Sequence, residues 1–497
     1  MPDQKKPTTP TRLDKPLLQL SKAKAHGQTP TNSKANRGVN AETVKKTRQK
    51  RKGDPSEQKQ NNAVAKGPVS TDLTSRQIVY EILVAVDKGL HLDKALAVNQ
   101  ALPKLDDRDR RFVRLLATNS LRYRGQLEKV LARLVERRPF GAQANANLIL
   151  LMGAAQIILL KTGAHAAVDN TVELMRQTGF ERLCGLANAL MRRLTREGEA
   201  LFAATNAMDN LPDWLQQSWR HYWGADVTSA IADLAMLPPP LDISVKGDAK
   251  AWAKTLEAQH ILGHSLRRQF DGNPSLLAGF DEGAWWVQDV AAALPAHLLN
   301  VTAGQTVIDL CAAPGGKTAQ LIVAGGTVTA IDNNRKRLDR LRRNLKRLQL
   351  SASLTLCDGR DYRPNAPVDA VLVDAPCSAT GTIRRRPDIL NKRDAEDISA
   401  LQQLQWELAT TALGWLRAGG CMVYATCSLQ PEEGEDIISA IIDGANGQYT
   451  IDPITPDQAG IFARSITDNG CIRILPNDYC DIGGVDGFFI ARLLSVY

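Results

Sequence analysis

The amino-acid sequence predicts an α/β protein with two folded domains. The N-terminal domain is all-helical, and in the C-terminal domain helices cover both faces of a doubly wound, largely parallel sheet. Two observations carry this prediction. Over residues 71–197, apolar side chains recur at helical spacing without strand-like alternation. Over residues 282–497, apolar β-branched runs alternate with helical segments, a pattern typical of parallel sheets with helices on both faces.

Six segments of the N-terminal domain are predicted as helices. In the first, residues 75–90, Ile78, Ile82 and Val86 follow each other at four-residue intervals and so line one helix face. The others are residues 106–124, 126–135, 146–161, 165–176 and 184–197. Residues 198–281 are expected to form a connecting α+β region, in which Leu241–Val245 resembles a strand.

In the C-terminal domain, strands and helices follow each other regularly. The predicted strands lie in TVIDL, TVTAID, SLTLCDG, DAVLVDA, GCMVYATCS and FFIARLL, and the helices include AQLIVA, residues 335–350 and ALQQLQWELATTALGWL. In such folds, ligands bind at the carboxyl ends of the parallel strands. Residues that bind ligands or take part in chemistry are therefore expected in the segments that follow these strands.

The first 70 residues differ in composition from the rest of the chain. They contain 16 Lys and Arg against 5 Asp and Glu, and no Ile, Phe, Tyr, Trp or Cys. Such a segment cannot bury enough apolar surface to offset its ordering entropy, so a disordered basic tail is expected over residues 1–70. Contact with a nucleic acid and a purely solubilising role both fit this tail. The whole chain carries a formal net charge of +9, so the remaining residues are close to neutral.

Several classes of protein are excluded. The longest apolar stretch, residues 147–160, is interrupted by Gln156 and is shorter than the roughly 18 apolar residues that a spanning helix needs. The eight cysteines include no C-x-x-C pair, so we expect neither a metal site nor a disulfide framework. The N-terminus lacks the apolar segment of a secretory signal. We expect a cytoplasmic monomer with reduced thiols.

The segment VIDLCAAPGGKT has the form of a ligand-binding turn. A buried strand ends at Asp309 and Leu310, and Gly315 and Gly316 allow the backbone to approach a ligand before a helix begins. The segment is neither the dinucleotide fingerprint nor a phosphate-binding loop, so no nicotinamide cofactor is implied.

An acid follows each of the next three strands: Asp332, Asp358 and Asp374. In doubly wound folds, an acid after the second strand binds ribose hydroxyls. Each acid alone could instead cap a helix or a turn, and for Asp332 the alternative is the N-cap of the helix that follows. Together on one edge of a sheet, the three acids predict a nucleoside pocket.

Two cysteines follow neighbouring strands beside this pocket, Cys377 and Cys427. A thiolate that adds to carbon 6 of a pyrimidine makes carbon 5 nucleophilic, which methyl transfer to carbon 5 requires. The remaining cysteines are interpreted as small apolar residues of the interior, except Cys311, whose backbone is assigned to the ligand loop. They are Cys184, Cys357, Cys421, Cys471 and Cys480.

The motifs DLCAAPGGKT, DAPCSATGTIRRRPDI and YATCSLQPEEGE resemble those of RNA 5-methylcytosine methyltransferases. The resemblance is strongest to the bacterial RsmB (Sun) subgroup, which methylates 16S ribosomal RNA. Residues 165–176 and 186–193 resemble NusB-type RNA-binding modules. The resemblance implies a NusB-like domain over residues 71–197, a Rossmann-like methyltransferase domain over residues 282–497, S-adenosylmethionine as cofactor and RNA as substrate.

Residue roles carry over by position. The resemblance implies that Cys427 is the nucleophile and that Cys377 assists release of the protein–RNA adduct by acting in removal of the carbon-5 proton. Asp332, Asp358 and Asp374 are the further cofactor residues, and Asp374 also contacts the target cytosine. The cofactor loop falls on Cys311, Ala312, Ala313, Pro314, Gly315, Gly316 and Lys317.

Two basic segments have open interpretations. Arg384, Arg385 and Arg386 follow Cys377 closely, and phosphate contact is expected for them. The helix at residues 335–350 has a leucine stripe and a face crowded with Arg and Lys, which fits either a solvated outer helix or RNA contact.

Other functions compete with methylation of 16S ribosomal RNA. The same chemistry could act on transfer RNA or 23S ribosomal RNA, and a non-catalytic RNA-binding assembly factor could keep the fold. DNA is a weaker candidate, because DNA enzymes use the cysteine of the Pro-Cys pair, here Cys377, as nucleophile.

Overall fold

The computed structural model describes residues 71–135, 139 and 141–496. The expected basic tail, residues 1–70, lies outside the described residues. In the described part, a search for helices with the length and apolarity of a membrane span finds none.

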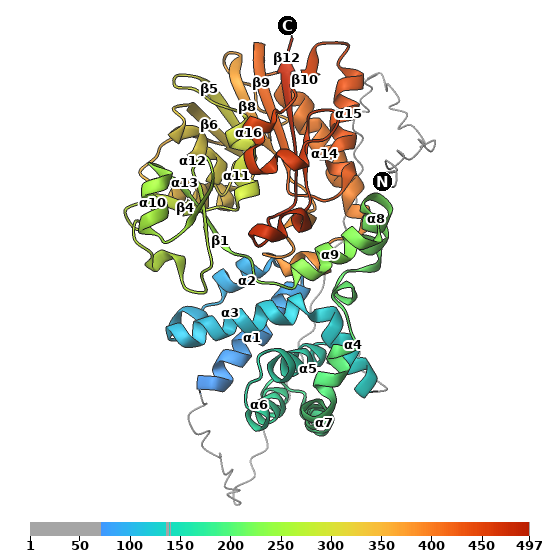
Figure 1. The fold of residues 1–497 in the computed structure, drawn as a ribbon. Helices are drawn as coiled ribbons and strands as arrows, with labels where there is room; N and C mark the ends of the chain where they lie inside the picture. The colour runs from blue at the N-terminus through green and yellow to red at the C-terminus, as the bar shows by residue number, and fades with distance from the viewer. Residues whose placement is uncertain (1–70, 136–138, 140, 497) are drawn as a thin grey trace, which may run out of the picture. The chain divides into compact units, whose positions relative to one another are not determined.

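The N-terminal domain is helical, as predicted (Figure 1). A single apolar core joins its helices, with Ile82, Leu116, Leu127 and Ile149 almost completely buried. Asp106 begins one helix by accepting a hydrogen bond from the backbone N–H of Asp109, the N-cap geometry that acidic residues favour. The helices are α1 (Thr71–Asp87), α2 (Leu92–Val98), α3 (Asp107–Arg122), α4 (Arg124–Leu134), α5 (Ala146–Ala154), α6 (Ala164–Gln177) and α7 (Cys184–Ala203).

Two helices and a small antiparallel sheet connect this domain to the larger sheet. The helices are α8 (Asp213–Trp223) and α9 (Ala225–Ala235), and α10 (Ala249–Thr255) follows the first strand. The sheet has the order β2-β3-β1-β4, formed by β1 (Leu241–Val245), β2 (Gln259–Leu262), β3 (Ser265–Arg268) and β4 (Trp285–Val287). Ser244 of β1 pairs with Trp286 of β4, so this sheet includes a strand that lies beyond residue 281.

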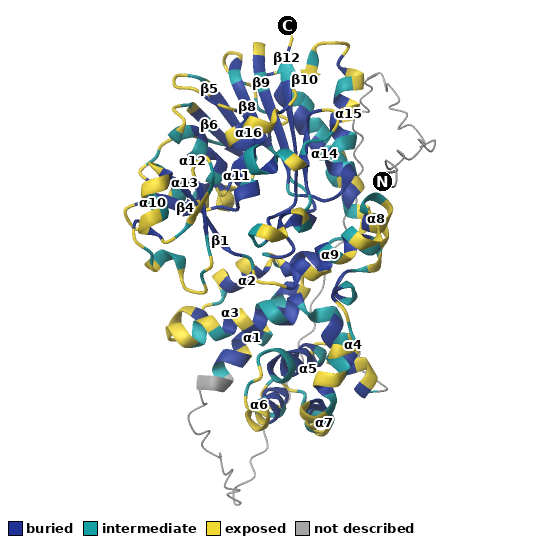
Figure 2. Cartoon of the chain, in the orientation of Figure 1, coloured by how far each residue is buried: buried dark blue, intermediate teal, exposed yellow. Residues whose placement is uncertain are grey.

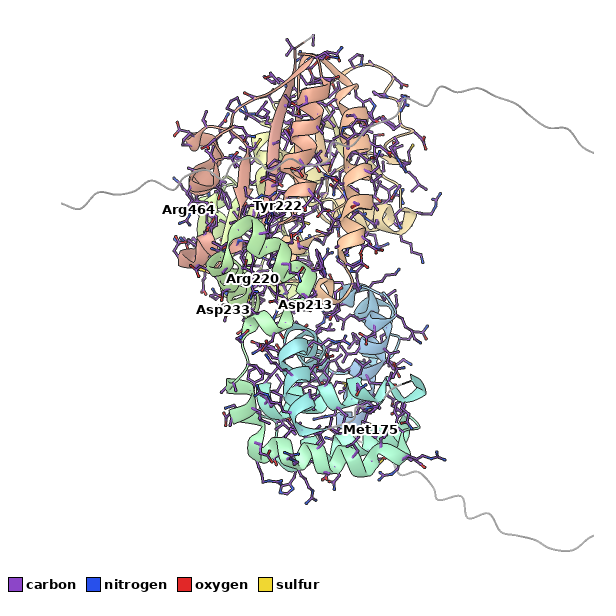
Figure 3. All side chains as sticks on the ribbon, turned by 90° about the vertical axis from the view of Figure 1, so that its right-hand side faces the viewer. Met175, Asp213, Arg220, Tyr222, Asp233 and Arg464 are labelled. Carbon is purple, nitrogen blue, oxygen red and sulfur yellow. The ribbon has the colours of Figure 1, made fainter. Side chains whose placement is uncertain are left out.

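Helix α8 is attached to the C-terminal domain by side-chain hydrogen bonds. Tyr222 donates to Glu432 at 3.0 Å, and the buried indole of Trp219 donates to Gln430 at 2.7 Å. Figure 3 shows Tyr222 beside the C-terminal domain, whereas Met175 lies within the helical domain.

The larger sheet confirms the predicted doubly wound architecture. Its strand order is β10-β12-β9-β8-β5-β6-β7, with β11 paired to β12. Pairing is parallel from β7 through β9, and β12 joins β9 antiparallel. The strands are β5 (Thr306–Leu310), β6 (Thr327–Asp332), β7 (Ser353–Leu356), β8 (Val368–Asp374), β9 (Leu416–Thr426), β10 (Tyr449–Ile451), β11 (Ile472–Ile474) and β12 (Phe488–Ser495).

Successive residues of the central strands enter different cores, because side chains alternate between the faces of a sheet. Leu372 packs in the core formed with α11 (Val290–Leu298) and α12 (Gly316–Val323). Val371 and Val373 pack in the core formed with α14 (Ala395–Leu413) and α15 (Glu435–Gly444). Figure 2 shows the resulting buried centre of the sheet. Because β5 to β9 pair parallel to one another, the segments that follow these five strands all emerge at one edge of the sheet.

Candidate active site

The turn after β5 is tightly constrained and held by α13 (Arg335–Arg347). Gly315 has φ +101°, and a Cβ atom there would lie 2.9 Å from Leu341 Cγ, so only glycine fits without a shift. The side chain of Arg337 donates to the Ala313 carbonyl at 2.8 Å, and Asn344 donates to the Pro314 carbonyl at 2.8 Å. The predicted cofactor loop is therefore a well-supported turn at the carboxyl end of β5.

Asp332 lies next to this turn and is almost completely buried. Its carboxylate accepts a hydrogen bond from the backbone N–H of Ala313 at 3.3 Å and forms an ion pair with Arg337 at 3.1 Å. The alternative that Asp332 is the N-cap of α13 is wrong, because Asn334 occupies that position and accepts from the Arg337 backbone N–H. The carboxylate is thus joined to the predicted cofactor loop.

Asp358 lies after β7, one strand further out than Asp332. Hydrogen bonds from Arg360 hold the pKa of Asp358 below its ordinary value. Arg360 is itself paired with Glu407 at 2.9 Å. Asp358 is therefore kept as a carboxylate by an arginine that α14 holds in place.

Asp374 ends β8 and forms an ion pair with Lys317 of the cofactor turn, with 2.8 Å between Nζ and Oδ2. Burial by itself would lower the pKa of Lys317, but the negative charges of Asp374, Cys427 and Asp309 raise it above its ordinary value. The Lys317 ammonium also lies 5.4 Å from the ring centre of Phe488. A stable cation thus stands beside the predicted nucleophile.

The structure brings the two predicted catalytic cysteines together. The Sγ atoms of Cys377 and Cys427 are 3.4 Å apart. A hydrogen bond with Cys427 and burial raise the pKa of Cys377 well above its ordinary value. At neutral pH, Cys377 therefore keeps its proton, and either sulfur can donate in the contact between the two thiols.

A buried glutamate that sequence reasoning did not single out joins the two cysteine loops. Ser378 follows Cys377 and donates its backbone N–H to Glu433 at 2.8 Å, and Ser428 follows Cys427 and donates its hydroxyl to Glu433 at 2.5 Å. Glu433 lies in the motif YATCSLQPEEGE, but nothing in that motif indicates which of its acids faces inward. Glu433 positions both thiols through their neighbouring serines.

Asp309 is a second residue that the sequence analysis did not assign. Its carboxyl is fully buried at the end of β5 and accepts a hydrogen bond from Thr318 at 2.5 Å. Its other oxygen, Oδ1, has no hydrogen-bond partner among the described residues. Burial raises the pKa of Asp309 to about 7. The sequence offered one indication of this residue, because Asp309 is an acid within the apolar strand TVIDL.

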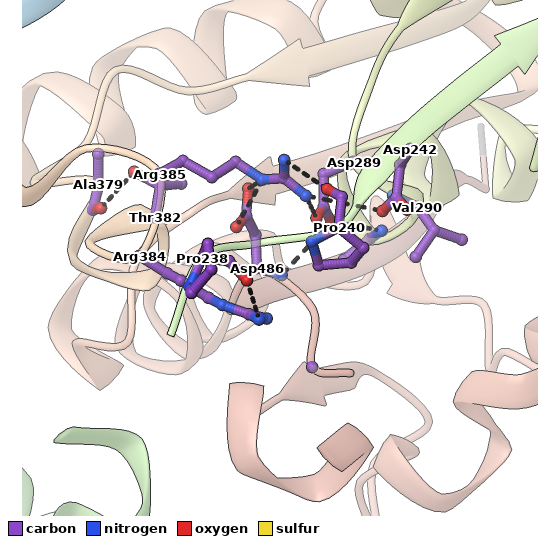
Figure 4. A network of polar contacts seen from close by, with 12 residues as sticks. Pro238, Pro240, Asp242, Asp289, Val290, Ala379, Thr382, Arg384, Arg385 and Asp486 are labelled. Atoms are coloured by element: carbon purple, nitrogen blue, oxygen red, sulfur yellow. Dashed lines mark hydrogen bonds and ion pairs between the residues drawn. The ribbon is translucent and has the colours of Figure 1, made fainter. Parts of the chain in front are cut away.

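The expected phosphate contact of Arg384 and Arg385 is wrong (Figure 4). The Arg384 side chain is buried and donates to the carbonyls of Leu237, Pro238 and Gly483. Arg385 forms ion pairs with Asp289 at 2.5 Å and Asp486 at 3.1 Å. Only Arg386 of the three is exposed.

These arginines are satisfied within the fold because the chain surrounds them with acceptors from distant segments. Asp242 belongs to the same cluster, where Arg267 binds it at 2.6 Å. Burial and the neighbouring carboxylate of Asp289 raise the pKa of Asp486 to about 7, although Arg385 opposes this. The Arg385 cluster, defined as Arg385, Arg267, Asp242, Asp289 and Asp486, fixes the segment that follows Cys377.

Of the cysteines assigned to the interior, Cys471 is buried, whereas Cys184, Cys357 and Cys421 are only partly buried. Burial raises the pKa of the Cys311, Cys421 and Cys471 thiols to about 12, which fits structural residues. Cys480 is exposed, so its assignment to the interior is wrong.

Comparisons with known proteins show the family of this chain. Residues 296–494 match the family described as 16S rRNA methyltransferase RsmB/F, and residues 73–196 match the NusB family. The chain is 36% identical over 424 residues to ribosomal RNA small subunit methyltransferase B of Pseudomonas putida, covering 80% of this chain and 94% of the relative. It is 33% identical over 444 residues to the protein of that name from Xylella fastidiosa strain Temecula1, covering 86% and 99%.

Solved structures share the fold. The crystal structure of PH0851 superimposes with a TM-score of 0.68 at 22% identity, covering 86% of this chain and 99% of that one. NSun6 from Pyrococcus horikoshii, solved with SFG, superimposes with a TM-score of 0.51 at 21% identity, covering 58% and 100%. From the matching family models and these relatives, the chain belongs to the RsmB/F family of 16S rRNA methyltransferases and carries an N-terminal domain of the NusB family.

Proposed function

We propose that this protein transfers a methyl group from S-adenosylmethionine to carbon 5 of a cytosine in 16S ribosomal RNA. The observation that carries the proposal is the pair of thiols at Cys377 and Cys427, 3.4 Å apart. Lys317, which is paired with Asp374, interacts electrostatically with Cys427. Family membership supports the small-subunit RNA as the substrate.

Methylation at carbon 5 needs a nucleophile, because this carbon of an aromatic pyrimidine is itself a poor one. The Cys427 thiolate adds to carbon 6, and the resulting enamine makes carbon 5 reactive. The protonated Cys377 can stabilise the same thiolate by donating a hydrogen bond to it.

Release requires the carbon-5 proton to leave. Loss of that proton, followed by cleavage of the bond between Cys427 and carbon 6, restores the aromatic ring and regenerates the thiolate. Once Cys427 is bonded to carbon, it no longer carries the negative charge that helps raise the pKa of Cys377. Cys377 then loses its own proton more readily, so its thiolate becomes available to accept the carbon-5 proton, which fits its role in proton removal.

The residues present fit S-adenosylmethionine. The unpartnered Oδ1 of Asp309 is a buried acceptor beside the loop that would hold the cofactor, and burying a carboxyl oxygen without a partner is unfavourable. The cofactor carries an ammonium group that such an oxygen can accept from. Asp332 would bind the ribose, Asp358 would bind the adenine amine, and the cofactor would supply the methyl group from a positively charged sulfur.

Bisulfite sequencing of ribosomal and transfer RNA from a deletion strain tests the substrate. We expect a cytosine of 16S ribosomal RNA to lose its methyl group, with restoration by the wild-type gene and not by Cys427→Ala. Loss at a cytosine of transfer RNA or 23S ribosomal RNA would contradict the proposed substrate. No change at any cytosine would support the non-catalytic assembly factor.

A further inference from the structure

Helix α13 has more positively charged side chains than it has hydrogen-bond and ion-pair partners for them. Its 13 residues, RKRLDRLRRNLKR, contain eight Lys and Arg and a single acid, Asp339. Three of the arginines have partners within the fold. Arg337 binds the cofactor turn, Arg342 pairs with Asp339, and Arg347 donates to the carbonyls of Phe280 and Trp285.

The other five cations form an exposed surface, here called the α13 basic face. Within the described part of the chain, the side chains of these five residues form no hydrogen bond or ion pair. They are Arg335, Lys336, Arg340, Arg343 and Lys346, and all are exposed.

Folding does not account for this face. The stripe of Leu338, Leu341 and Leu345 is buried and already attaches the helix to the domain. On the opposite side, Arg340 and Arg343, and then Arg343 and Lys346, are separated by three residues, and like charges at this spacing destabilise a helix. A solvated face would be more stable with alternating charges.

We propose that the α13 basic face binds the phosphate backbone of ribosomal RNA. This inference rests on the proposed function, under which the protein must hold a polyanion. The chain apart from residues 1–70 is close to neutral, so its attraction for RNA depends on local concentrations of positive charge.

Its position and length suit this partner. The helix begins directly after the predicted ribose-binding acid Asp332, and Arg337 and Asn344 of the same helix hold the cofactor turn. From Lys336 to Lys346 the face spans about 15 Å, and a stacked strand presents a phosphate about every 3.4 Å along its axis. RNA held there lies against the cofactor side of the site.

The test compares two triple variants of the full chain that remove equal charge. Arg340→Gln/Arg343→Gln/Lys346→Gln neutralises the basic face. Arg363→Gln/Arg417→Gln/Arg464→Gln is the matched control, because these exposed cations lie outside the NusB-family domain and have partners within the fold. Arg363 donates to the carbonyls of Arg360 and Tyr362, and Arg417 and Arg464 pair with Asp369 and Asp481.

Dissociation constants for transcribed 16S ribosomal RNA are measured over a range of salt concentrations. Each lost phosphate contact reduces the slope of log affinity against log salt by about 0.7–0.9, so we expect the face variant to lose about 2. The control should keep the wild-type slope.

An unchanged slope in the face variant, or an equal loss in the control, would overturn the proposal. Urea unfolding of the face variant checks that its helix is intact. The proposed function is tested separately in the same samples by formation of 5-methylcytosine with the wild-type chain. Absence of 5-methylcytosine would contradict the proposed methylation reaction. The salt dependence of RNA affinity would still show whether the α13 basic face binds RNA.

Discussion

The thiols of Cys377 and Cys427 are 3.4 Å apart although 50 residues separate them in the chain. Their loops follow β8 and β9, which are adjacent and parallel, and both loops reach the same glutamate. Gly381 strengthens the link by donating its backbone N–H to the Cys427 carbonyl at 2.9 Å. The pair is thus built by sheet topology and a buried polar network.

Glu433→Gln should separate positioning from cofactor binding. A glutamine has one acceptor oxygen in place of two and cannot satisfy Ser378, Ser428 and Gln405 together. We expect the rate of methylation to fall by at least about tenfold, since a misplaced reacting group is costly, with unchanged affinity for S-adenosylmethionine. Single-turnover kinetics and calorimetry measure the two quantities. Equal rates in variant and wild type would exclude this role for Glu433.

Replacing Arg385 and Arg386 separately by methionine should change the free energy of unfolding by different amounts. Arg385→Met removes the ion pairs of Arg385 with the buried carboxylates of Asp289 and Asp486, and breaking a buried pair costs about 3–5 kcal/mol. Arg386→Met alters an exposed side chain and should change stability by no more than about 0.5 kcal/mol. Urea unfolding of both variants gives the comparison. Similar losses would contradict the structural role of the Arg385 cluster.

The raised pKa of Asp309 has a consequence for stability. The folded chain binds this proton more tightly than the unfolded chain, because burial moves the pKa from 3.8 to about 7. Its favourable contribution is present below about pH 4 and is lost as the pH rises to about 7.

At about 1.4 kcal/mol per pH unit, the wild type should lose about 2–3 kcal/mol more between pH 5 and pH 7.5 than Asp309→Asn. The free energy of unfolding in urea at the two pH values measures this. Asp486, whose pKa is also about 7, titrates in both proteins and cancels. Parallel pH profiles would show that Asp309 ionises normally.

Asp332→Asn tests the ribose assignment. The variant keeps the shape of the side chain but loses the charge, and a hydrogen bond to a charged group is worth about 1.5–3 kcal/mol. We therefore expect the dissociation constant of S-adenosylmethionine to rise by at least about tenfold in calorimetry. Because Asp332 also contacts the Ala313 backbone, circular dichroism must show an intact fold. Unchanged affinity in the folded variant would remove Asp332 from the cofactor site.

The positions of the central strands along the chain could be predicted, because they depend on local patterns of the sequence. Runs such as TVIDL and TVTAID are apolar and β-branched, and they form β5 and β6 at those residues. The encounter of Cys377 with Cys427 also followed, since both end strands of one parallel sheet. Helical spacing similarly predicted the N-terminal domain.

Contacts between distant segments could not be predicted. Arg385 resembles a phosphate ligand in sequence, but Asp289 and Asp486 reach it from elements about 100 residues away on either side. The sequence around Ser244 does not indicate that this residue pairs with β4. The inward orientation of Glu433 depends on a hydrogen bond from Gln405 of α14. These residues acquire their roles from packing, which local patterns do not contain.

The central claim is that Cys427 forms the bond to cytosine and Cys377 promotes its release. The most direct test is a denaturing gel of each alanine variant after incubation with substrate RNA and S-adenosylmethionine. Cys377→Ala should accumulate a protein–RNA adduct that survives denaturation, because attack and methyl transfer proceed while proton removal is hindered. Cys427→Ala should form no adduct. An adduct with Cys427→Ala and none with Cys377→Ala would contradict the account and reverse the roles of the two thiols.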